Sequence, residues 1–250
     1  MPRLPAARLF CILGLAALAA LTVSLPFADL QPSFTAHVVS YALALVPVAA
    51  LIYGFPDLVR DLATPRLLTL GAVSATLGFL AALACRPDAF DAGPRLLPLA
   101  LLYLANVLRL CAAASLGLAL ARYVISPGVA LLIAVLAAVS DLFSVLAGPT
   151  KVLLSKGSPA LDFLILVFPS FGAPLGFGFG LSDFVFLALF AYISLLLGLR
   201  YQTTLLFCSA AAMLAAVTAL SLEQPLPALP FICLGFVLAN IWQILARMRK

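Results

Sequence analysis

Long runs of apolar residues dominate this chain and leave few ways for it to fold. A helix needs roughly 20 apolar residues to cross the hydrocarbon core of a bilayer. Eight stretches approach that length: 9–25, 37–55, 67–85, 96–121, 124–147, 179–199, 203–221 and 229–246. Hydrophobic residues make up 65% of the chain and charged residues 9%, against about 25% charged in a typical soluble domain. We therefore predict an all-α transmembrane helix bundle of about eight spans.

Two further segments need an interpretation. The apolar stretch 160–169 is too short to cross and contains Pro169, so we expect it to lie at the interface or to re-enter the membrane. The N-terminal stretch resembles a signal peptide, because Arg3 and Arg8 precede an apolar run. Its run is long and lacks a small-residue cleavage site, so we expect a retained first helix.

The basic residues are divided unequally between the loops, which predicts an orientation. With eight spans, the side that carries both termini holds nine Lys and Arg residues, and the opposite side holds four. Cytoplasmic loops are enriched in Lys and Arg, so we predict cytoplasmic termini. These cations are scattered rather than clustered, and the net charge of +5 therefore does not indicate a nucleic-acid partner.

The five cysteines all lie in or at the ends of apolar stretches, and none forms a CxxC pair: Cys11, Cys85, Cys111, Cys208 and Cys233. Free cysteine is among the most buried residue types. We interpret them as small buried hydrophobic residues and predict neither a disulfide framework nor a metal site. No cofactor is predicted either.

Two of the nine acidic residues lie inside apolar runs, while the other seven lie in or beside loops. Asp141 is embedded in AAVSDLFSVLAG, and Asp183 is embedded in GFGLSDFVFLAL. An isolated aspartate at the centre of a membrane helix costs ~2.5–3.5 kcal/mol on insertion scales. A functional role for the pair is therefore favoured over two merely buried polar groups.

The predicted helix ends place these two carboxylates at similar depth. A helix from Pro127 to about Ala147 puts Asp141 roughly 9 Å from its end, and a helix that begins near Gly178 puts Asp183 roughly 7–8 Å from its start. Residues 148–178 join these two ends, which therefore face the same side of the membrane. We predict that both carboxylates lie at matching depth below one face.

A third element, Pro227-Ala228-Leu229-Pro230, returns to that same face at the start of the last apolar stretch. Two prolines three residues apart cannot both donate to a helix ladder. The pattern predicts an irregular helix start with backbone groups beside the aspartates. An ordinary helix-initiation signal is the alternative interpretation.

Together, these elements resemble the motifs of presenilin and signal peptide peptidase, the GxGD intramembrane aspartyl proteases. The stretch YVISPGVALLIAVLAAVSDLFSVLAGPTKVL is similar to the segment around the family's first catalytic aspartate, Gly180-Leu181-Ser182-Asp183 to its Gly-x-Gly-Asp motif, and Pro227-Ala228-Leu229 to its Pro-Ala-Leu signature. The resemblance spans roughly 123–246.

The resemblance implies a presenilin-like fold with an N-terminal scaffold at 1–122 and a catalytic half at 123–250. It also implies an aspartic endopeptidase that cuts transmembrane segments of membrane proteins or signal peptides. Its catalytic residues are Asp141 and Asp183, and its substrate-binding residues are Gly180, Leu181, Ser182, Pro227, Ala228, Leu229 and Pro230. We expect a short prokaryotic homologue in a bacterial or archaeal cytoplasmic membrane.

Some features depart from the family pattern. Ser140 replaces the family's tyrosine and Ser182 its second glycine, which bears on rate and substrate preference. The loop 148–159 is too short for the long autocleaved segment of animal presenilins. We therefore expect an unprocessed single chain without obligate partner subunits, as in signal peptide peptidase.

Peptide hydrolysis by this pair requires one ionised and one protonated carboxyl group, because like charges at close range share a proton. One takes a proton from the attacking water while the other polarises the carbonyl. The substrate helix must first unwind. The Gly- and Pro-rich segment 170–180 is not expected to be helical throughout, and with Pro227–Pro230 it offers extended backbone edges to the unwound substrate. A flexible linker is the alternative.

Other functions stay open at this point. A catalytically inactive homologue that binds membrane proteins is one, given Ser140 and Ser182. A transporter that uses the aspartates for protons or cations is another, although the two halves show no repeat. A prepilin-type peptidase shares a GxGD aspartate without the Pro-Ala-Leu element. Asn106 and Arg109, one helical turn apart, are expected to hydrogen-bond neighbouring helices.

Overall fold

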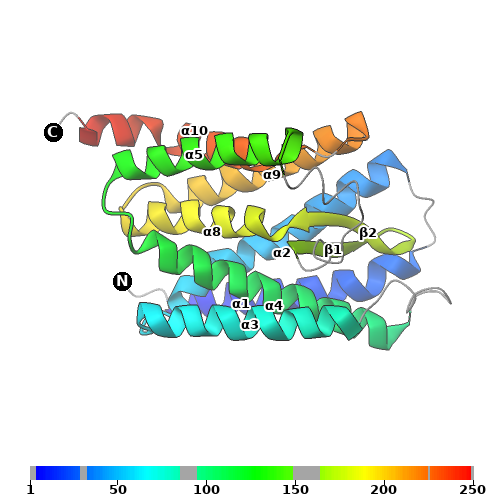
Figure 1. Cartoon of the computed structure of the whole chain (residues 1–250). Helices are drawn as coiled ribbons and strands as arrows, with labels where there is room; N and C mark the ends of the chain where they lie inside the picture. The colour runs from blue at the N-terminus through cyan, green and yellow to red at the C-terminus, as the bar shows by residue number, and fades with distance from the viewer. Residues whose placement is uncertain (1–3, 29–32, 85–94, 149–163, 225, 249–250) are drawn as a thin grey trace. The chain divides into compact units, whose positions relative to one another are not determined.

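The computed structural model describes residues 4–28, 33–84, 95–148, 164–224 and 226–248. This described part is helical apart from one two-stranded hairpin (Figure 1). Seven of the described helices are long and apolar enough to cross a membrane, so the chain is a multi-pass membrane protein by length and composition. The elements are α1 (Leu4–Ser24), η1 (Leu25–Phe27), α2 (Phe34–Leu58), α3 (Thr64–Ala84), α4 (Leu96–Ala121), α5 (Pro127–Leu146), β1 (Ile165–Ser170), β2 (Ala173–Gly180), α8 (Leu181–Leu196), α9 (Tyr201–Leu222) and α10 (Leu229–Met248).

The chain divides into two compact units. The first unit comprises 1–115 and 162–181, and so contains α1, α2, α3, most of α4 and the hairpin. Inside it, α1 and α2 pack closely, and a Cβ placed on Gly14 would lie 2.9 Å from the carbonyl oxygen of Pro47. Helix α4 is tied to α1 by the Tyr103 hydroxyl, which donates to the carbonyl of Leu15 over 3.2 Å.

An aromatic cluster holds one face of the hairpin inside the first unit. Strands β1 and β2 pair antiparallel, with Leu166 opposite Phe179 and Phe168 opposite Phe177. The Phe177 ring stacks on Phe168 and lies 4.0 Å, between centroids, from the Tyr41 ring of α2. These buried rings face one way, because side chains alternate along a strand.

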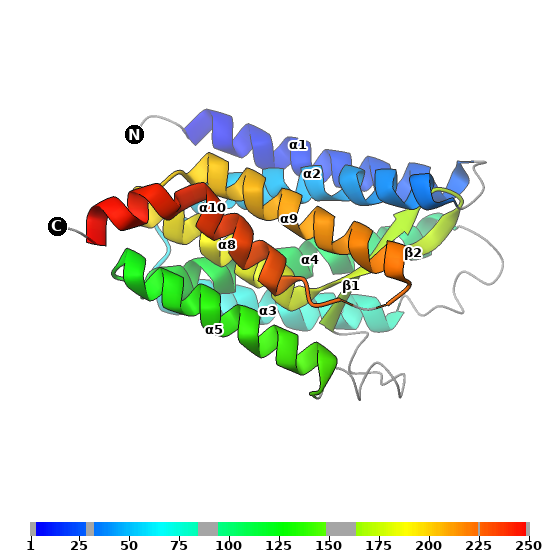
Figure 2. The same cartoon turned by 90° about the horizontal axis from the view of Figure 1, so that it is seen from above.

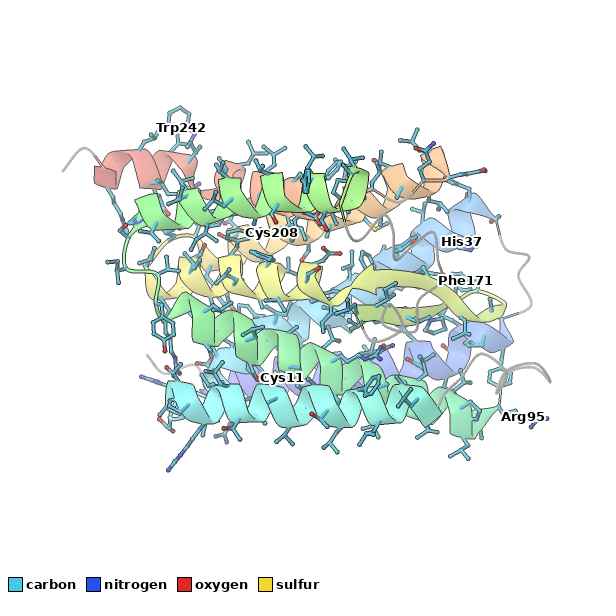
Figure 3. The ribbon with its side chains drawn as sticks, viewed as in Figure 1. Cys11, His37, Arg95, Phe171, Cys208 and Trp242 are labelled. Carbon is cyan, nitrogen blue, oxygen red and sulfur yellow. The ribbon has the colours of Figure 1, made fainter. Side chains whose placement is uncertain are left out.

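The turn of the hairpin is fixed by two backbone hydrogen bonds. The N–H of Phe171 donates to Ser40 Oγ of α2 over 3.3 Å, and the N–H of Gly172 donates to the Leu25 carbonyl of η1 over 3.0 Å. Gly172 has a φ of 72°, which glycine adopts at no steric cost. Figure 3 labels Phe171 at this turn.

The second unit comprises 116–161 and 182–250, and so contains α5, α9, α10 and nearly all of α8. Helix α5 begins where Ser126 Oγ accepts the N–H of Val129 and Pro127 occupies the first turn. Helix α10 packs against both α5 and α9. Within this unit α8 and α10 run in the same direction, because α9 reverses the chain between them (Figure 2).

A buried polar network joins α8, α9 and α10. Asn240 Nδ2 donates to Thr204 Oγ1 over 2.7 Å and to Ser194 Oγ over 3.4 Å, while Asn240 Oδ1 accepts the N–H of Arg200 over 3.2 Å. The Ser194 and Thr204 hydroxyls also share a hydrogen bond of 2.9 Å. Asn240 is 1% exposed, so all these polar groups find partners within the bundle.

Large apolar side chains cover much of the helix surface. Trp242 projects outward from α10 and is 77% exposed (Figure 3). On α5, Val139 and Phe143 are 61% and 66% exposed. A soluble surface would not carry such residues in this density, whereas hydrocarbon solvates them.

One of the sequence predictions about elements needs correction. The structure has seven membrane-length helices among its described residues rather than eight, because the predicted span 179–199 becomes α8, of only 16 residues. The reason is that the preceding residues pair in β2 instead of extending the helix. The stretch 160–169 was expected at the interface or as a re-entrant segment; its described part lies in strand β1 from Ile165 onward. The non-helical character of 170–180 is confirmed.

Candidate functional site

Asp141 lies near the C-terminal end of α5 and contacts the start of α10. It is half-buried, and its Oδ2 accepts the backbone N–H of Leu229 over 3.0 Å. Leu229 is the first residue of α10 and is 5% exposed. The first N–H groups of a helix have no partner inside it, so Asp141 supplies one from a different helix. This bond orients the carboxylate.

Asp183 lies in the first turn of α8, two residues after the helix begins. The sequence predicts a helix start near Gly178, which would put Asp183 roughly 7–8 Å from that start. Because α8 begins at Leu181 instead, Asp183 lies only about 3 Å along the helix axis from its start. Asp183 is half-buried and the preceding Ser182 is exposed. Ser140, the other departure from the family pattern, is also exposed on α5.

A ring contact relates Asp183 to Leu229. Phe190 of α8 stacks on Phe236 of α10, with centroids 4.7 Å apart and planes at 21°. Phe190 follows Asp183 by seven residues, and Phe236 follows Leu229 by seven. Since α8 and α10 run in the same direction (Figure 2), Asp183 lies at the level of Leu229 along the bundle.

The polar network gives the same register from independent atoms. Ser194 follows Asp183 by eleven residues, Asn240 follows Leu229 by eleven, and the Asn240 amide donates to the Ser194 hydroxyl. Because Asp141 bonds the N–H of Leu229, the two aspartates share one level of the second unit. That the carboxylates of Asp141 and Asp183 face each other at close range stays a prediction.

The Pro-Ala-Leu segment forms the start of α10. Pro227 is buried, while Ala228 and Pro230 are partly exposed. The carbonyl of Ala228 accepts the N–H groups of Phe231 and Ile232, each over 3.1 Å. Pro230 lies in the first turn, where its missing N–H leaves no hydrogen bond unmade. The prolines therefore initiate the helix, and the Leu229 N–H is left for Asp141.

Cys233 was not singled out by the sequence as part of a site. It is 4% exposed and lies near Asp141. It follows Leu229 by four residues, so both residues occupy one face of α10. That spacing from the Pro-Ala-Leu segment is the signal that would have located it.

Gly180 and Leu181 join the hairpin to α8. Gly180 is the last residue of β2 and Leu181 is the first of α8, so the strand ends three residues before Asp183. Side chains are nearly absent along one face of β2: a Cβ on Gly178 would lie 2.5 Å from Ile165 Cγ2. Glycine is therefore required for the close approach of the two strands there.

Asn106 and Arg109, which were expected to hydrogen-bond neighbouring helices, both bond strand β1. Asn106 Nδ2 donates to the Val167 carbonyl over 2.6 Å, and Arg109 Nη1 donates to the Ile165 carbonyl over 2.8 Å. No local pattern in the sequence indicated a hairpin beside α4. Both side chains are buried.

The described residues offer no group of three or more His, Cys, Asp or Glu side chains that could hold a metal ion. The loop 148–159, expected to be short and uncut, falls on 149–163, which lie outside the described residues. Searches of protein-family models and of curated proteins find no match to this chain.

Proposed function

We propose that this chain is an intramembrane aspartyl protease of the presenilin and signal peptide peptidase type. Its substrates would be single transmembrane segments of membrane proteins or signal peptides. Asp141 and Asp183 would act as the catalytic pair, without a cofactor, a metal ion or an obligate partner subunit. Both termini would be cytoplasmic, and the catalytic pair would lie toward the opposite side.

The observation that carries the proposal is the 3.0 Å hydrogen bond from the Leu229 N–H to Asp141 Oδ2. It joins two of the three motif elements, although they are 88 residues apart in sequence. The register of α8 against α10 supports the third, because it brings Asp183 to the same level. A buried structural aspartate would explain one such position, but not two at one level beside a helix start.

The reaction needs only the two carboxyl groups and water. The ionised member removes a proton from water as the water oxygen bonds to the peptide carbon, and the protonated member donates to the carbonyl oxygen. Collapse of the tetrahedral intermediate breaks the C–N bond, and a proton passes to the leaving nitrogen. The products are a new carboxyl end and a new amino end, so all atoms balance.

The substrate would be held as an added strand. In the antiparallel pair, residues alternate between those whose backbone groups face the partner strand and those that face away. A peptide paired along β2 would be held in extended form, with its backbone hydrogen-bonded to the strand. Strand addition of this kind supplies affinity through main-chain hydrogen bonds and tolerates varied sequences.

The test is cleavage of a single-span substrate by purified protein in lipid nanodiscs, with a matched set of three variants. Asp141→Asn keeps an oxygen that can accept the Leu229 N–H, so it removes the acid without removing the contact. Asp183→Asn does the same on α8. Asp61→Asn, at an exposed loop position, is the control.

We expect both membrane variants to lose activity by at least ~10²-fold, the lower range for general acid–base catalysis, while Asp61→Asn cleaves like the wild type. Full activity in either Asp141→Asn or Asp183→Asn would contradict the proposal. A wild type that binds single-span proteins without cutting them would favour the inactive homologue, and proton- or cation-driven flux lost in both variants would favour a transporter.

A further inference from the structure

The hairpin has two outer edges, which differ in the hydrogen bonds that their backbone groups make. Phe168 pairs with Phe177 and Leu166 with Phe179. Pro169 lies at the register shift between Phe168 and Ser170, where its missing N–H leaves no ladder bond unmade. Ile165 and Val167 form one alternate set of β1, and the bonds from α4 to their carbonyls mark it as the set that faces away from β2.

Helix α4 occupies this outer edge of β1. Arg109 donates to the outward carbonyl of Ile165 over 2.8 Å, and Asn106 donates to the outward carbonyl of Val167 over 2.6 Å. The two donors are 3% and 1% exposed. Backbone outside a helix is tolerated at membrane depth only where protein or water satisfies it. Buried cations in membrane helices characteristically pair with carbonyls.

The outer edge of β2 differs. Gly178 pairs with Val167, so its N–H and C=O also face away from the partner strand. Among the residues that the structure describes, none hydrogen-bonds to these groups of Gly178. Gly178 is also exposed, and it carries no side chain beside that edge.

We propose that Asn106 and Arg109 are positioning residues that close the β1 edge, so that a substrate strand can add to the hairpin only along β2. This inference rests on the proposed function, because the added strand is the unwound substrate. By fixing the carbonyls of Ile165 and Val167, α4 holds β1, and the ladder bonds of the alternate pairs Leu166–Phe179 and Phe168–Phe177 hold β2 to β1 in turn. The hairpin thus keeps one position within the first unit.

The first arm of the test measures hydrogen exchange of the segment 164–180 in nanodiscs. Arg109→Met and Asn106→Leu remove the donors and leave apolar side chains. Arg109→Lys restores one donor group, and Arg66→Met removes an exposed cation as the matched control. Exchange in the hairpin should accelerate roughly three- to twentyfold in the first two variants, the range measured for hydrogen bonds between membrane helices. Arg109→Lys should restore most of the protection.

The second arm measures cleavage of the same single-span substrate. A positioning role predicts that Arg109→Met and Asn106→Leu raise KM about threefold or more while kcat changes less than about twofold, since strand pairing is binding energy. A role in stability alone would change neither constant in the folded fraction. Asn106→Leu removes no charge, so both constants can still be measured in this variant if Arg109→Met fails to fold.

Unchanged hairpin exchange in both folded variants would overturn the inference. Faster exchange with an unchanged KM would overturn the positioning role and leave α4 as a structural support. An inactive wild-type protein would refute the proposed function, and with it the substrate part of this inference. The exchange arm would still decide in that case whether α4 holds β1.

Discussion

Asn240 should be a main determinant of stability in the second unit, and replacing it with leucine tests this. The substitution keeps the branching and the number of heavy atoms of the side chain but removes the amide that reaches Ser194, Thr204 and the N–H of Arg200. Thr204 would keep its bonds to Ser194 and to the Arg200 carbonyl. The loss is therefore three contacts between helices, together with the bond from Asn240 Nδ2 to the Phe236 carbonyl within α10.

The magnitude follows from those three contacts. Hydrogen bonds between membrane helices contribute ~0.6 kcal/mol on average and up to ~1.7 kcal/mol. Three average bonds predict that Asn240→Leu lowers the free energy of unfolding by about 2 kcal/mol. Because the network also sets the register of α8 against α10, the variant should cleave more slowly even where it remains folded.

Reversible unfolding in bicelles, followed by steric trapping or denaturant, measures this free energy. Thr218→Val is the matched control, because Thr218 is on α9 and its hydroxyl bonds only its own helix at the Leu214 carbonyl. The control should change stability by less than about 0.5 kcal/mol. An Asn240→Leu protein as stable as the wild type would refute the account of the network.

Three further outcomes are expected. Gly235→Ala should lower the free energy of unfolding by ~1–3 kcal/mol in the same assay, because the added Cβ would lie 2.7 Å from a carbonyl oxygen of α9. Gly128→Ala is the control and should leave stability unchanged, because the nearest atom to its Cβ is 3.9 Å away. Ser182→Gly should leave cleavage intact or faster in the nanodisc assay, since removing an exposed side chain beside the catalytic aspartate widens the backbone's freedom, and lost cleavage in a folded protein would give the hydroxyl a role. A reporter enzyme fused after Lys250 should be active in the cytoplasm, and one inserted within 148–159 should be active on the opposite side of the membrane. The reverse pattern would contradict the orientation predicted from the loop charges.

The long apolar helices could be predicted from the sequence, because burial in lipid requires uninterrupted hydrophobicity. The predicted helix from Pro127 to about Ala147 agrees with α5, which ends at Leu146. The hairpin could not be predicted. Its strand ILVFPS is as apolar as a membrane helix, and its partner is rich in glycine, which disfavours strands. Only pairing between the two, a non-local contact, defines them.

The candidate site was predictable as a set of residues but not as a set of contacts. Hydropathy isolated Asp141 and Asp183, because no other acids lie deep in apolar runs. The bond from Leu229 to Asp141 joins positions 88 residues apart, and no local pattern encodes it. Arg109 could be singled out from the sequence as a cation inside an apolar run. Its hydrogen-bond partner, the Ile165 carbonyl, could not, because it belongs to strand β1, which the sequence did not predict.

Locating the cut in a single-span substrate tests the central claim most directly. Purified wild-type protein in nanodiscs is incubated with the substrate in water enriched in ¹⁸O, and the products are read by intact-mass spectrometry. The account predicts a cut inside the transmembrane segment, one ¹⁸O atom in the new carboxyl end, and no such products from Asp183→Asn. A cut confined to the substrate's water-exposed ends, or transmembrane products that persist in Asp183→Asn, would contradict it.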